Sequence, residues 1–95
     1  VLNNDALGMV RQWQTLFFAG RYSQTTLSRK TDYVRLAEAF GAKGIRLTEL
    51  SELDRVLDEA LSTDGPVVID AVIDPDERVL PMIPPGGTID DIILS

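Results

Sequence analysis

The chain has 95 residues and a formal net charge of −6, which indicates at most one small domain and argues against binding to nucleic-acid phosphates. It contains neither cysteine nor histidine, which excludes disulfides, thiolate nucleophiles and any catalysis or metal binding that depends on histidine. No apolar run approaches the ~20 residues that span a bilayer and no signal peptide is recognisable, so we expect a cytoplasmic protein without membrane contact, or a plastid one.

The chain begins with what reads as the end of a buried strand, Val1 and Leu2, followed by a loop at residues 3–5. A natural domain rarely begins at the end of a strand, so we expect the chain to be part of something longer. A group of residues then falls mainly on one side at helical spacing: Leu7, Val10, Trp13, Gln14, Leu16, Phe17 and Phe18. Gly20 suits the end of this helix, and residues 21–30 are polar without a clear period, which favours a loop.

A second helix is predicted to begin at Thr31 or Asp32, either of which suits the cap, and to end at Gly41. Its apolar face would consist of Tyr33, Leu36, Ala37 and Phe40. Residues 44–48 then alternate between apolar and polar side chains, which is typical of a short strand.

A third helix is predicted to begin at Thr48 or Ser51 and to end before Gly65 and Pro66. Its buried stripe would consist of Leu50, Leu53, Val56, Leu57, Ala60 and Leu61. Five carboxylates interleave with this stripe: Glu49, Glu52, Asp54, Asp58 and Glu59. We interpret them as a solvated face of the helix rather than as acid–base catalysts.

Residues 67–73 form a nearly continuous β-branched run, the pattern of a strand that is buried on both faces. Asp70 interrupts this run, either as a buried hydrogen-bonded carboxylate or at a sheet edge, and we assign it no catalytic role. The segment 74–95 is rich in proline and glycine and should form a surface tail, with one helical turn at 89–94. Helices that alternate with short strands predict an α/β fold, with helices flanking a parallel sheet.

The loop after the first strand is a candidate ligand site, because open α/β sheets bind ligands beyond the carboxyl ends of their strands. Amide oxygens of Asn3 and Asn4 suit Mg²⁺, and a backbone carbonyl of the loop can add a ligand. The helix that follows offers its N-terminus to an anion. The same pair also suits an Asx turn with a helix cap, and the pair alone favours that interpretation.

Residues of the first helix suit an aromatic ligand. Gly8 permits a close approach to the backbone, Met9 offers a soft apolar surface, and Trp13 lies one helical turn after Met9. Spacing alone explains Met9 and Trp13 more simply as core residues. A loose basic group surrounds the polar loop: Arg21, Arg29, Lys30 and Arg35. It either attracts an anionic substrate or, more simply, balances the acidic chain.

Several strings follow one another along the chain: Leu2-Asn3-Asn4, Leu7-Gly8-Met9-Val10-Arg11-Gln12-Trp13-Gln14, Arg21-Tyr22-Ser23, the block 32–41, Gly65 to Asp70, and Val79 to Gly87. Together they resemble the large catalytic subunit of acetolactate synthase (acetohydroxyacid synthase). The resemblance implies that residues 1–79 form the C-terminal part of a Rossmann-like thiamine-diphosphate-binding domain. Residues 80–95 would form a C-terminal tail over the active-site channel.

The resemblance also implies a set of cofactor-binding residues: Asn4, Ala6, Leu7, Gly8 and Met9. Asn4 and the backbone carbonyl of Ala6 would bind the Mg²⁺ that holds the diphosphate of the cofactor. Met9 would lie near the pyrimidine ring of thiamine diphosphate. Met9, Val10 and Trp13 would line the substrate and herbicide channel, where Trp13 would help to choose the second 2-keto acid.

The implied reaction is the decarboxylation of pyruvate and its condensation with pyruvate or 2-oxobutyrate, in branched-chain amino-acid biosynthesis. The family's Gly-Asp-Gly metal motif and its cofactor-activating glutamate are absent from these residues. We therefore assign no catalytic residue here and expect the isolated chain to be inactive. The implied partners are the rest of the large subunit, a homodimer or tetramer of large subunits and a regulatory small subunit, and FAD would be bound mainly outside this chain.

Other thiamine-diphosphate enzymes, such as glyoxylate carboligase, are the nearest rivals, but the run from Gly8 to Trp13 and the tail from Leu80 to Gly87 favour acetolactate synthase. A different class of function is also compatible with the residues. The chain would then be a stand-alone non-catalytic α/β module or a decayed cassette. Its open sheet edge and apolar first helix would serve as a dimerisation or binding surface.

Overall fold

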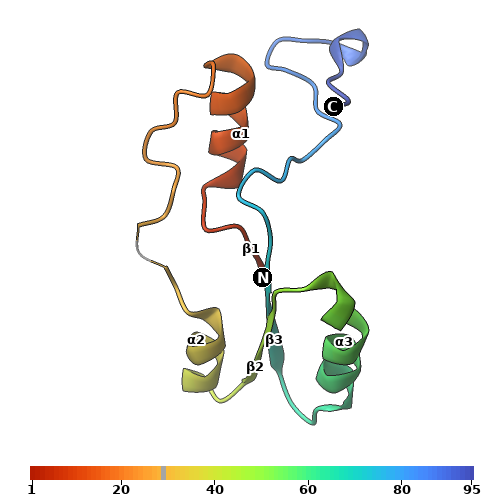
Figure 1. The fold of residues 1–95 in the computed structure, drawn as a ribbon. Coiled ribbons are helices and arrows are strands. Elements are labelled where there is room, and N and C mark those ends of the chain that lie inside the picture. The colour runs from red at the N-terminus through yellow and green to blue at the C-terminus, as the bar shows by residue number, and fades with distance from the viewer. Residues whose placement is uncertain (29) are drawn as a thin grey trace.

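The computed structural model describes residues 1–28 and 30–95. Its elements, in chain order, are β1 (Leu2–Asn3), α1 (Gly8–Phe17), α2 (Tyr33–Ala39), β2 (Lys43–Leu47), the 3-10 helix η1 (Leu50–Glu52), α3 (Leu53–Ser62), β3 (Val67–Val72) and the 3-10 helix η2 (Ile89–Asp91). The sheet, α2 and α3 form one end of the molecule, while α1 and the C-terminal tail form the other (Figure 1).

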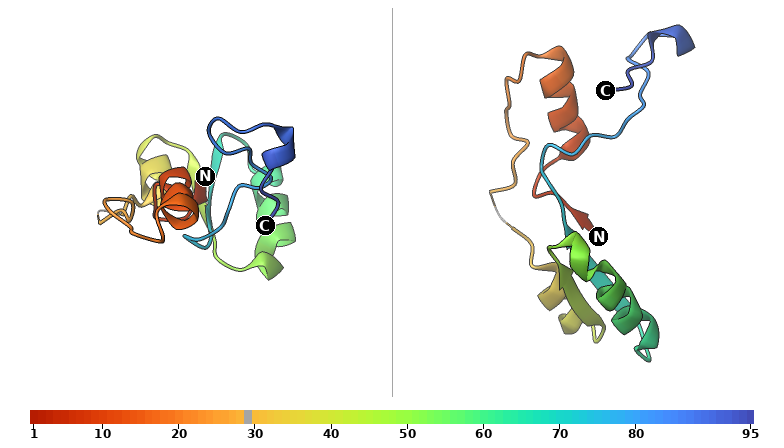
Figure 2. Two further views of the ribbon diagram at one scale, coloured as in Figure 1. Left: turned by 90° about the horizontal axis from the view of Figure 1, so that it is seen from above. Right: turned by 45° about the vertical axis from the view of Figure 1, so that its right-hand side comes forward.

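The molecule is elongated, as the right-hand view of Figure 2 also shows. Its radius of gyration is 16.9 Å, whereas a compact chain near this length has a radius of about 13 Å. The strands form one parallel sheet in the order β1-β3-β2, so that β3 lies in the centre. The prediction of an α/β fold with helices flanking a parallel sheet is therefore confirmed.

Helices α2 and α3 cover opposite faces of this sheet (Figure 1). Val56 of α3 is completely buried against Ile45 and Leu47 of β2, and Ile69 and Ala71 of β3 pack around the same cluster. These four strand residues alternate along their strands, which places them on one face of the sheet. The apolar core of the described residues therefore lies mainly between α3 and the sheet.

Helix α2 lies unusually close to the other face of the sheet at Gly44. A Cβ atom at Gly44 would lie 2.7 Å from the carbonyl oxygen of Val34 and 2.8 Å from its Cα atom. Asp32 caps α2, because its Oδ1 atom accepts a hydrogen bond of 3.2 Å from the backbone N–H of Arg35. Of the two predicted caps, the structure selects Asp32, and Gly41 follows the helix with a φ of 79°.

The predicted start of the third helix is wrong. Neither Thr48 nor Ser51 caps it, because the short helix η1 intervenes and α3 begins at Leu53. Two apolar side chains of the predicted buried stripe, Leu50 and Leu61, are 83% and 85% exposed. Within the described residues the sheet has three strands, so it covers the inner side of α3 and leaves these positions outside.

Two predictions of burial in the strands are also wrong. Leu2 is 78% exposed, because β1 is a two-residue strand at the edge of the sheet. Strand β3 is not buried on both faces: Asp70 is its one fully buried residue and Val72 is 40% exposed. The strand ends at Val72, one residue earlier than predicted.

In α2, the buried residue is Ala37, whereas Phe40 is 83% exposed.

The C-terminal tail folds back on itself. Met82 and Ile93 form an antiparallel bridge with reciprocal backbone hydrogen bonds of 3.0 and 2.8 Å. Thr88 and Asp91 form a capping box around η2, which is shorter than the predicted helical turn at 89–94. Within the described residues, no helix has the length and apolar character that crossing a membrane requires.

We predict that Gly44→Ala destabilises the protein by about 1–3 kcal/mol, since the added methyl group meets main-chain atoms of α2. A glycine-to-alanine change inside a strand would otherwise stabilise it by roughly 0.5–1 kcal/mol. Denaturant unfolding of the complete protein measures the change. The double variant with Val34→Ala should not recover, because the nearest atoms belong to the backbone. Full recovery would contradict the proposed contact.

Candidate ligand site at the start of helix α1

The loop between β1 and α1 is built from two Asx turns. The Oδ1 atom of Asn3 accepts a hydrogen bond from the N–H of Asp5, and that of Asn4 accepts one from the N–H of Ala6, both at 3.2 Å. Asp5 has a φ of 51°, a left-handed conformation that aspartate tolerates. The Asx-turn interpretation is confirmed, but the helix-cap interpretation is wrong, because the residue before α1 is Leu7 and no side chain caps the helix.

This loop pairs with residues 25–27, which sequence reasoning described as a loop without regular structure. The N–H of Leu7 donates to the carbonyl of Thr25 at 2.8 Å, and the N–H of Leu27 donates to that of Asp5 at 3.0 Å. Ala6 lies between these bonds, and no described residue donates a hydrogen bond to its carbonyl oxygen. That oxygen is therefore available to a ligand.

Because Gly8 has no side chain, the side chain of Asn4 occupies the space beside it. A Cβ atom at Gly8 would lie 2.6 Å from the Nδ2 atom of Asn4, a distance that real Cβ atoms essentially never show. The carboxamide of Asn4 therefore lies directly against the first residue of α1. A side chain at position 8 would displace it.

The loop fits a metal ion that is bound to an anion. It can supply some of the ligands of that ion, but not all of them. The Oδ1 atom of Asn4 and the carbonyl of Ala6 are the hard oxygen ligands that Mg²⁺ prefers, and Mg²⁺ takes six. No group of three or more His, Asp or Glu side chains in the described ranges 1–28 and 30–95 could hold a metal ion. The first turn of α1 contains no acidic residue, so its N-terminus can face an anion.

One side of α1 forms an open apolar hollow of about 630 Å³, lined by Met9, Val10, Trp13, Gln14, Phe18 and Arg21. Met9 is 49% exposed and Trp13 is 37% exposed, so the interpretation of these residues as core is wrong. Met9 and Trp13, which lie one helical turn apart in the sequence, line the same hollow. The ring of Phe17 meets that of Trp13 edge to face, with centroids 5.8 Å apart.

The predicted basic group does not act as one cluster. Lys30 forms an ion pair of 2.7 Å with Asp5, and Arg35 forms one of 3.5 Å with Asp32. These two residues balance acidic neighbours, whereas Arg21 supplies the charge among the residues that line the apolar hollow. Arg29 lies outside the described residues, so its place in the group stays a prediction.

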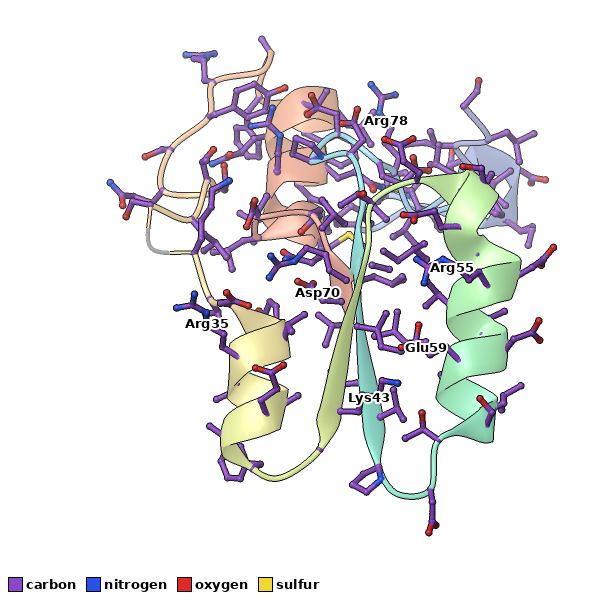
Figure 3. The ribbon with its side chains drawn as sticks, turned by 60° about the horizontal axis from the view of Figure 1, so that its bottom comes forward. Arg35, Lys43, Arg55, Glu59, Asp70 and Arg78 are labelled. Atoms are coloured by element: carbon purple, nitrogen blue, oxygen red, sulfur yellow. The ribbon has the colours of Figure 1, made fainter. Side chains whose placement is uncertain are left out.

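Asp70 is buried in the central strand, which decides between its two predicted positions. It is 1% exposed, and its Oδ2 atom accepts a hydrogen bond of 3.3 Å from the Nε atom of Arg46 (Figure 3). Arg46 also bonds Asp32 at 2.7 Å. The pKa of Asp32 is lowered, first by the backbone N–H of Arg35 and then by the charge of Arg46. The group links the sheet to the start of α2.

The carboxylates of the third helix serve as partners of basic side chains or face solvent. Glu59 lies 2.7 Å from the Nζ atom of Lys43, which lowers the pKa of Glu59, and Arg55 bridges Glu59 and Glu52 (Figure 3). Asp54 is exposed. These contacts agree with the interpretation of a solvated face rather than a catalytic pair.

Sequence reasoning missed three polar residues of α1 that attach other segments to it. Arg11 forms an ion pair of 2.6 Å with Asp76, and its guanidinium lies 4.0 Å from the ring centre of Tyr22. Gln14 bonds the carbonyl of Ser23 and the hydroxyl of Thr25, and Gln12 bonds the C-terminal tail. In the sequence, the feature that could have indicated such an attachment is the amide of Gln12, which lies three residues after Met9 and beside the apolar stripe of the helix.

The chain matches a known protein family and several named proteins. The sequence profile described as "Thiamine pyrophosphate enzyme, C-terminal TPP binding domain" matches residues 1–71. The chain is 44% identical over 93 residues to the acetolactate synthase isozyme 2 large subunit of Escherichia coli. It is 45% identical over 93 residues to the mitochondrial acetolactate synthase catalytic subunit of Saccharomyces cerevisiae. Each alignment covers 98% of this chain, but only 17% and 13% of the two relatives.

We predict that Arg11→Gln raises the pKa of Asp76 towards its ordinary value. The pKa of Asp76 is lowered, chiefly by the hydrogen bond from Arg11. A lowered carboxyl pKa stabilises the folded state above the ordinary pKa of 3.8, and this contribution is lost as the pH falls through the folded value. An NMR titration of the Asp76 carboxyl group measures the shift. Arg78→Gln is the matched control and should change it less, since Arg78 acts on Asp76 only through its charge.

Proposed function

This chain belongs to the family of thiamine pyrophosphate enzymes, in their C-terminal TPP-binding domain, and we propose that it is part of the catalytic large subunit of an acetolactate synthase. Relatives with that name align with nearly the whole chain at 42–45% identity. The chain spans 13–17% of the length of these relatives. The rest of the large subunit would supply the remaining parts of the site.

The contact between Gly8 and Asn4 is the observation that carries this proposal. The Nδ2 atom of Asn4 lies against Gly8 while its Oδ1 atom accepts from the N–H of Ala6. The loop thus holds the Asn4 oxygen, a carbonyl of Ala6 to which no described residue donates, and the uncapped N-terminus of α1. In the proposed enzyme, Asn4 and Ala6 would bind Mg²⁺, and the start of α1 would face the diphosphate of the cofactor. A loop that served only as a turn would need neither the free carbonyl nor the uncapped helix.

Thiamine diphosphate, when bound, supplies the electron sink that lets one 2-keto acid lose CO₂ and join a second one. The residues of this chain would bind and orient. Leu7, Gly8 and Met9 would lie along the cofactor, with Met9 near its pyrimidine ring. The chain supplies no catalytic base of its own in this proposal, so the group that activates the cofactor would come from another part of the large subunit.

The apolar hollow on α1 suits the proposed substrates, pyruvate and 2-oxobutyrate. These are small anions with a short alkyl group. Met9, Val10 and Trp13 provide an apolar wall for the alkyl group, and Arg21 provides a positive charge at the same hollow for the carboxylate. The same wall would form part of the proposed herbicide site. The proposed product would enter branched-chain amino-acid biosynthesis.

The proposal extends to partners and location. Large apolar side chains remain uncovered on α2, where Phe40 is 83% exposed, and at the edge strand, where Leu2 is 78% exposed. They would be covered by the rest of the large subunit and by a second large subunit, in a dimer or tetramer. FAD, a regulatory small subunit and a cytoplasmic or plastid location belong to the same proposal. The tail at 80–95 would help to cover the channel.

A stand-alone binding module is the second candidate, and the same exposed surface favours it. An apolar hollow of about 330 Å³ lies on the face of α2, and its lining includes Val1, Tyr33, Leu36, Phe40 and Val68. A module would use this hollow and the open edge of β1 to form a dimer. It would bind no thiamine diphosphate at any Mg²⁺ concentration, so a calorimetric titration of the complete protein separates the two candidates.

We predict that Asn4→Ala weakens Mg²⁺-dependent binding of thiamine diphosphate at least about tenfold in the complete protein. Gly8→Ala should weaken it in the same direction, because its methyl group displaces the Asn4 carboxamide. Asn3→Ala is the matched control, since the Asn3 Oδ1 atom accepts from the N–H of Asp5 and from no other described residue. Calorimetry measures the affinity, and acetolactate formation from pyruvate measures the activity. Equal losses in the Asn3 and Asn4 variants would refute the metal site.

We also predict that Trp13→Leu reduces the preference for 2-oxobutyrate over pyruvate. The two substrates differ by one methylene group, which an apolar pocket distinguishes by roughly 1–3 kcal/mol. Loss of the indole wall should lower the ratio of the kcat/KM value for 2-oxobutyrate to that for pyruvate about tenfold. Phe40→Leu, on the distant helix α2, should leave the ratio unchanged. An unchanged ratio in the Trp13 variant would remove Trp13 from the proposed channel.

A further inference from the structure

Gln12 is the buried residue of a helix that is otherwise half-buried or exposed. Its side chain is 4% exposed, and no apolar residue of α1 is buried to the same degree. Burial of an unpaired amide is costly, so both ends of the side chain need partners. Those partners come from residues far away in the sequence, on the C-terminal tail.

The amide of Gln12 pairs with the backbone of Val79 as a neighbouring strand would. Its Oε1 atom accepts a hydrogen bond of 2.8 Å from the N–H of Val79, and its Nε2 atom donates one of 3.1 Å to the carbonyl of the same residue. The Nε2 atom also lies 3.0 Å from the Sδ atom of Met82. One side chain therefore holds the tail at both ends of a four-residue stretch.

This attachment extends to the far limb of the tail. Met82 forms the antiparallel bridge with Ile93, so the segment that Gln12 holds is itself bonded to the last residues of the described chain. The ion pair between Arg11 and Asp76 attaches the segment just before Val79 to the same helix. The tail thus meets α1 on one side, while Met9 and Trp13 occupy the side with the apolar hollow.

We infer that Gln12 is a positioning residue, which fixes the C-terminal tail relative to the helix that carries Met9 and Trp13. Its role in catalysis rests on the proposed function: while Gln12 holds it, the tail would cover the channel from beside α1, although no described tail residue lines the hollow itself. The attachment itself does not depend on that function. The two can therefore be tested separately.

Gln12→Met is the decisive variant. Methionine keeps the length and approximate volume of glutamine, so a residue that only fills space would tolerate the change. It removes the hydrogen-bond donor and the acceptor, which leaves the N–H and carbonyl of Val79 unpaired in a partly buried place. The tail can restore hydrogen bonds to these groups by leaving the helix for water. The expected effect is detachment of the tail rather than unfolding of the sheet.

Cleavage by trypsin after Arg78 reports this detachment. Arg78 is exposed and lies directly before Val79, on the segment that runs beside α1 (Figure 3). A peptide that begins at Val79 reports this cut, and residues 79–95 contain no lysine or arginine at which trypsin would divide it. In the complete protein, mass spectrometry should detect that peptide at least about tenfold faster for Gln12→Met than for the unchanged protein.

Gln14→Met is the matched control on the same helix. The amide of Gln14 bonds Ser23 and Thr25 instead of the tail. This variant should accelerate cleavage after Arg21 and leave the cut after Arg78 at its original rate. Equal release of the Val79 peptide from both variants would overturn the assignment to Gln12, as would an unchanged rate in Gln12→Met.

Hydrogen exchange keeps the inference testable if Gln12→Met does not fold. In the unchanged protein, the amide of Val79 should exchange more slowly than that of the exposed Arg78, and equal exchange would contradict the attachment. For the folded variant, kinetics add the functional readout. The KM for the second 2-keto acid should rise several-fold, while Mg²⁺-dependent cofactor binding stays within twofold. A loss of cofactor binding instead would show that Gln12 supports the whole site rather than the tail.

Discussion

The parallel pairing of β3 with both neighbouring strands is the constraint on which the rest of the structure depends. Leu2 of β1 lies beside Ala71 of β3, and the N–H of Ile73 donates to the carbonyl of Asn3 at 2.9 Å. Because the two strands are parallel, the chain leaves both at the same edge of the sheet. The loop before α1 and the start of the C-terminal tail therefore emerge side by side. Helix α1 contacts both, which is how Gly8 meets Asn4 and Gln12 meets Val79.

Helix α1 is attached to the rest of the molecule mainly by polar contacts. The ion pair of Arg11, the buried amide of Gln12 and the hydrogen bonds of Gln14 connect it to the tail and to the loop at 21–27. Its large apolar side chains at Met9 and Trp13 take no part in this attachment. The helix thus keeps an apolar side available for a ligand, whereas an ordinary amphipathic helix would bury that side in its own core. Helix α3 differs, because its apolar side packs against the sheet and its Val56 is completely buried.

Sequence periodicity predicted the order of helices and strands and the parallel sheet, because local patterns depend on neighbours in the chain. It failed for burial: Leu2 and Leu61 look like core residues, but Leu2 lies in the edge strand β1 and Leu61 lies on a side of α3 that the sheet does not cover. The residues of the candidate loop were recognised by resemblance, and the structure adds the physical reason for Gly8. The role of Gln12 could not be predicted, since its partners are distant in sequence and an amide has no periodic signature.

The pairing of β1 has a kinetic consequence. Ile45 of β2 pairs with Ile69 of β3 through a connection that contains α3, whereas Leu2 of β1 pairs with Ala71 only after a much longer loop has closed, which contains α1, α2, β2 and α3. Closing a longer loop costs more conformational entropy, so the unit of β2, α3 and β3 should form first and β1 should dock late. The loop between β1 and α1 would then be assembled near the end of folding. Changes there would mainly accelerate unfolding and leave the folding rate nearly unaltered.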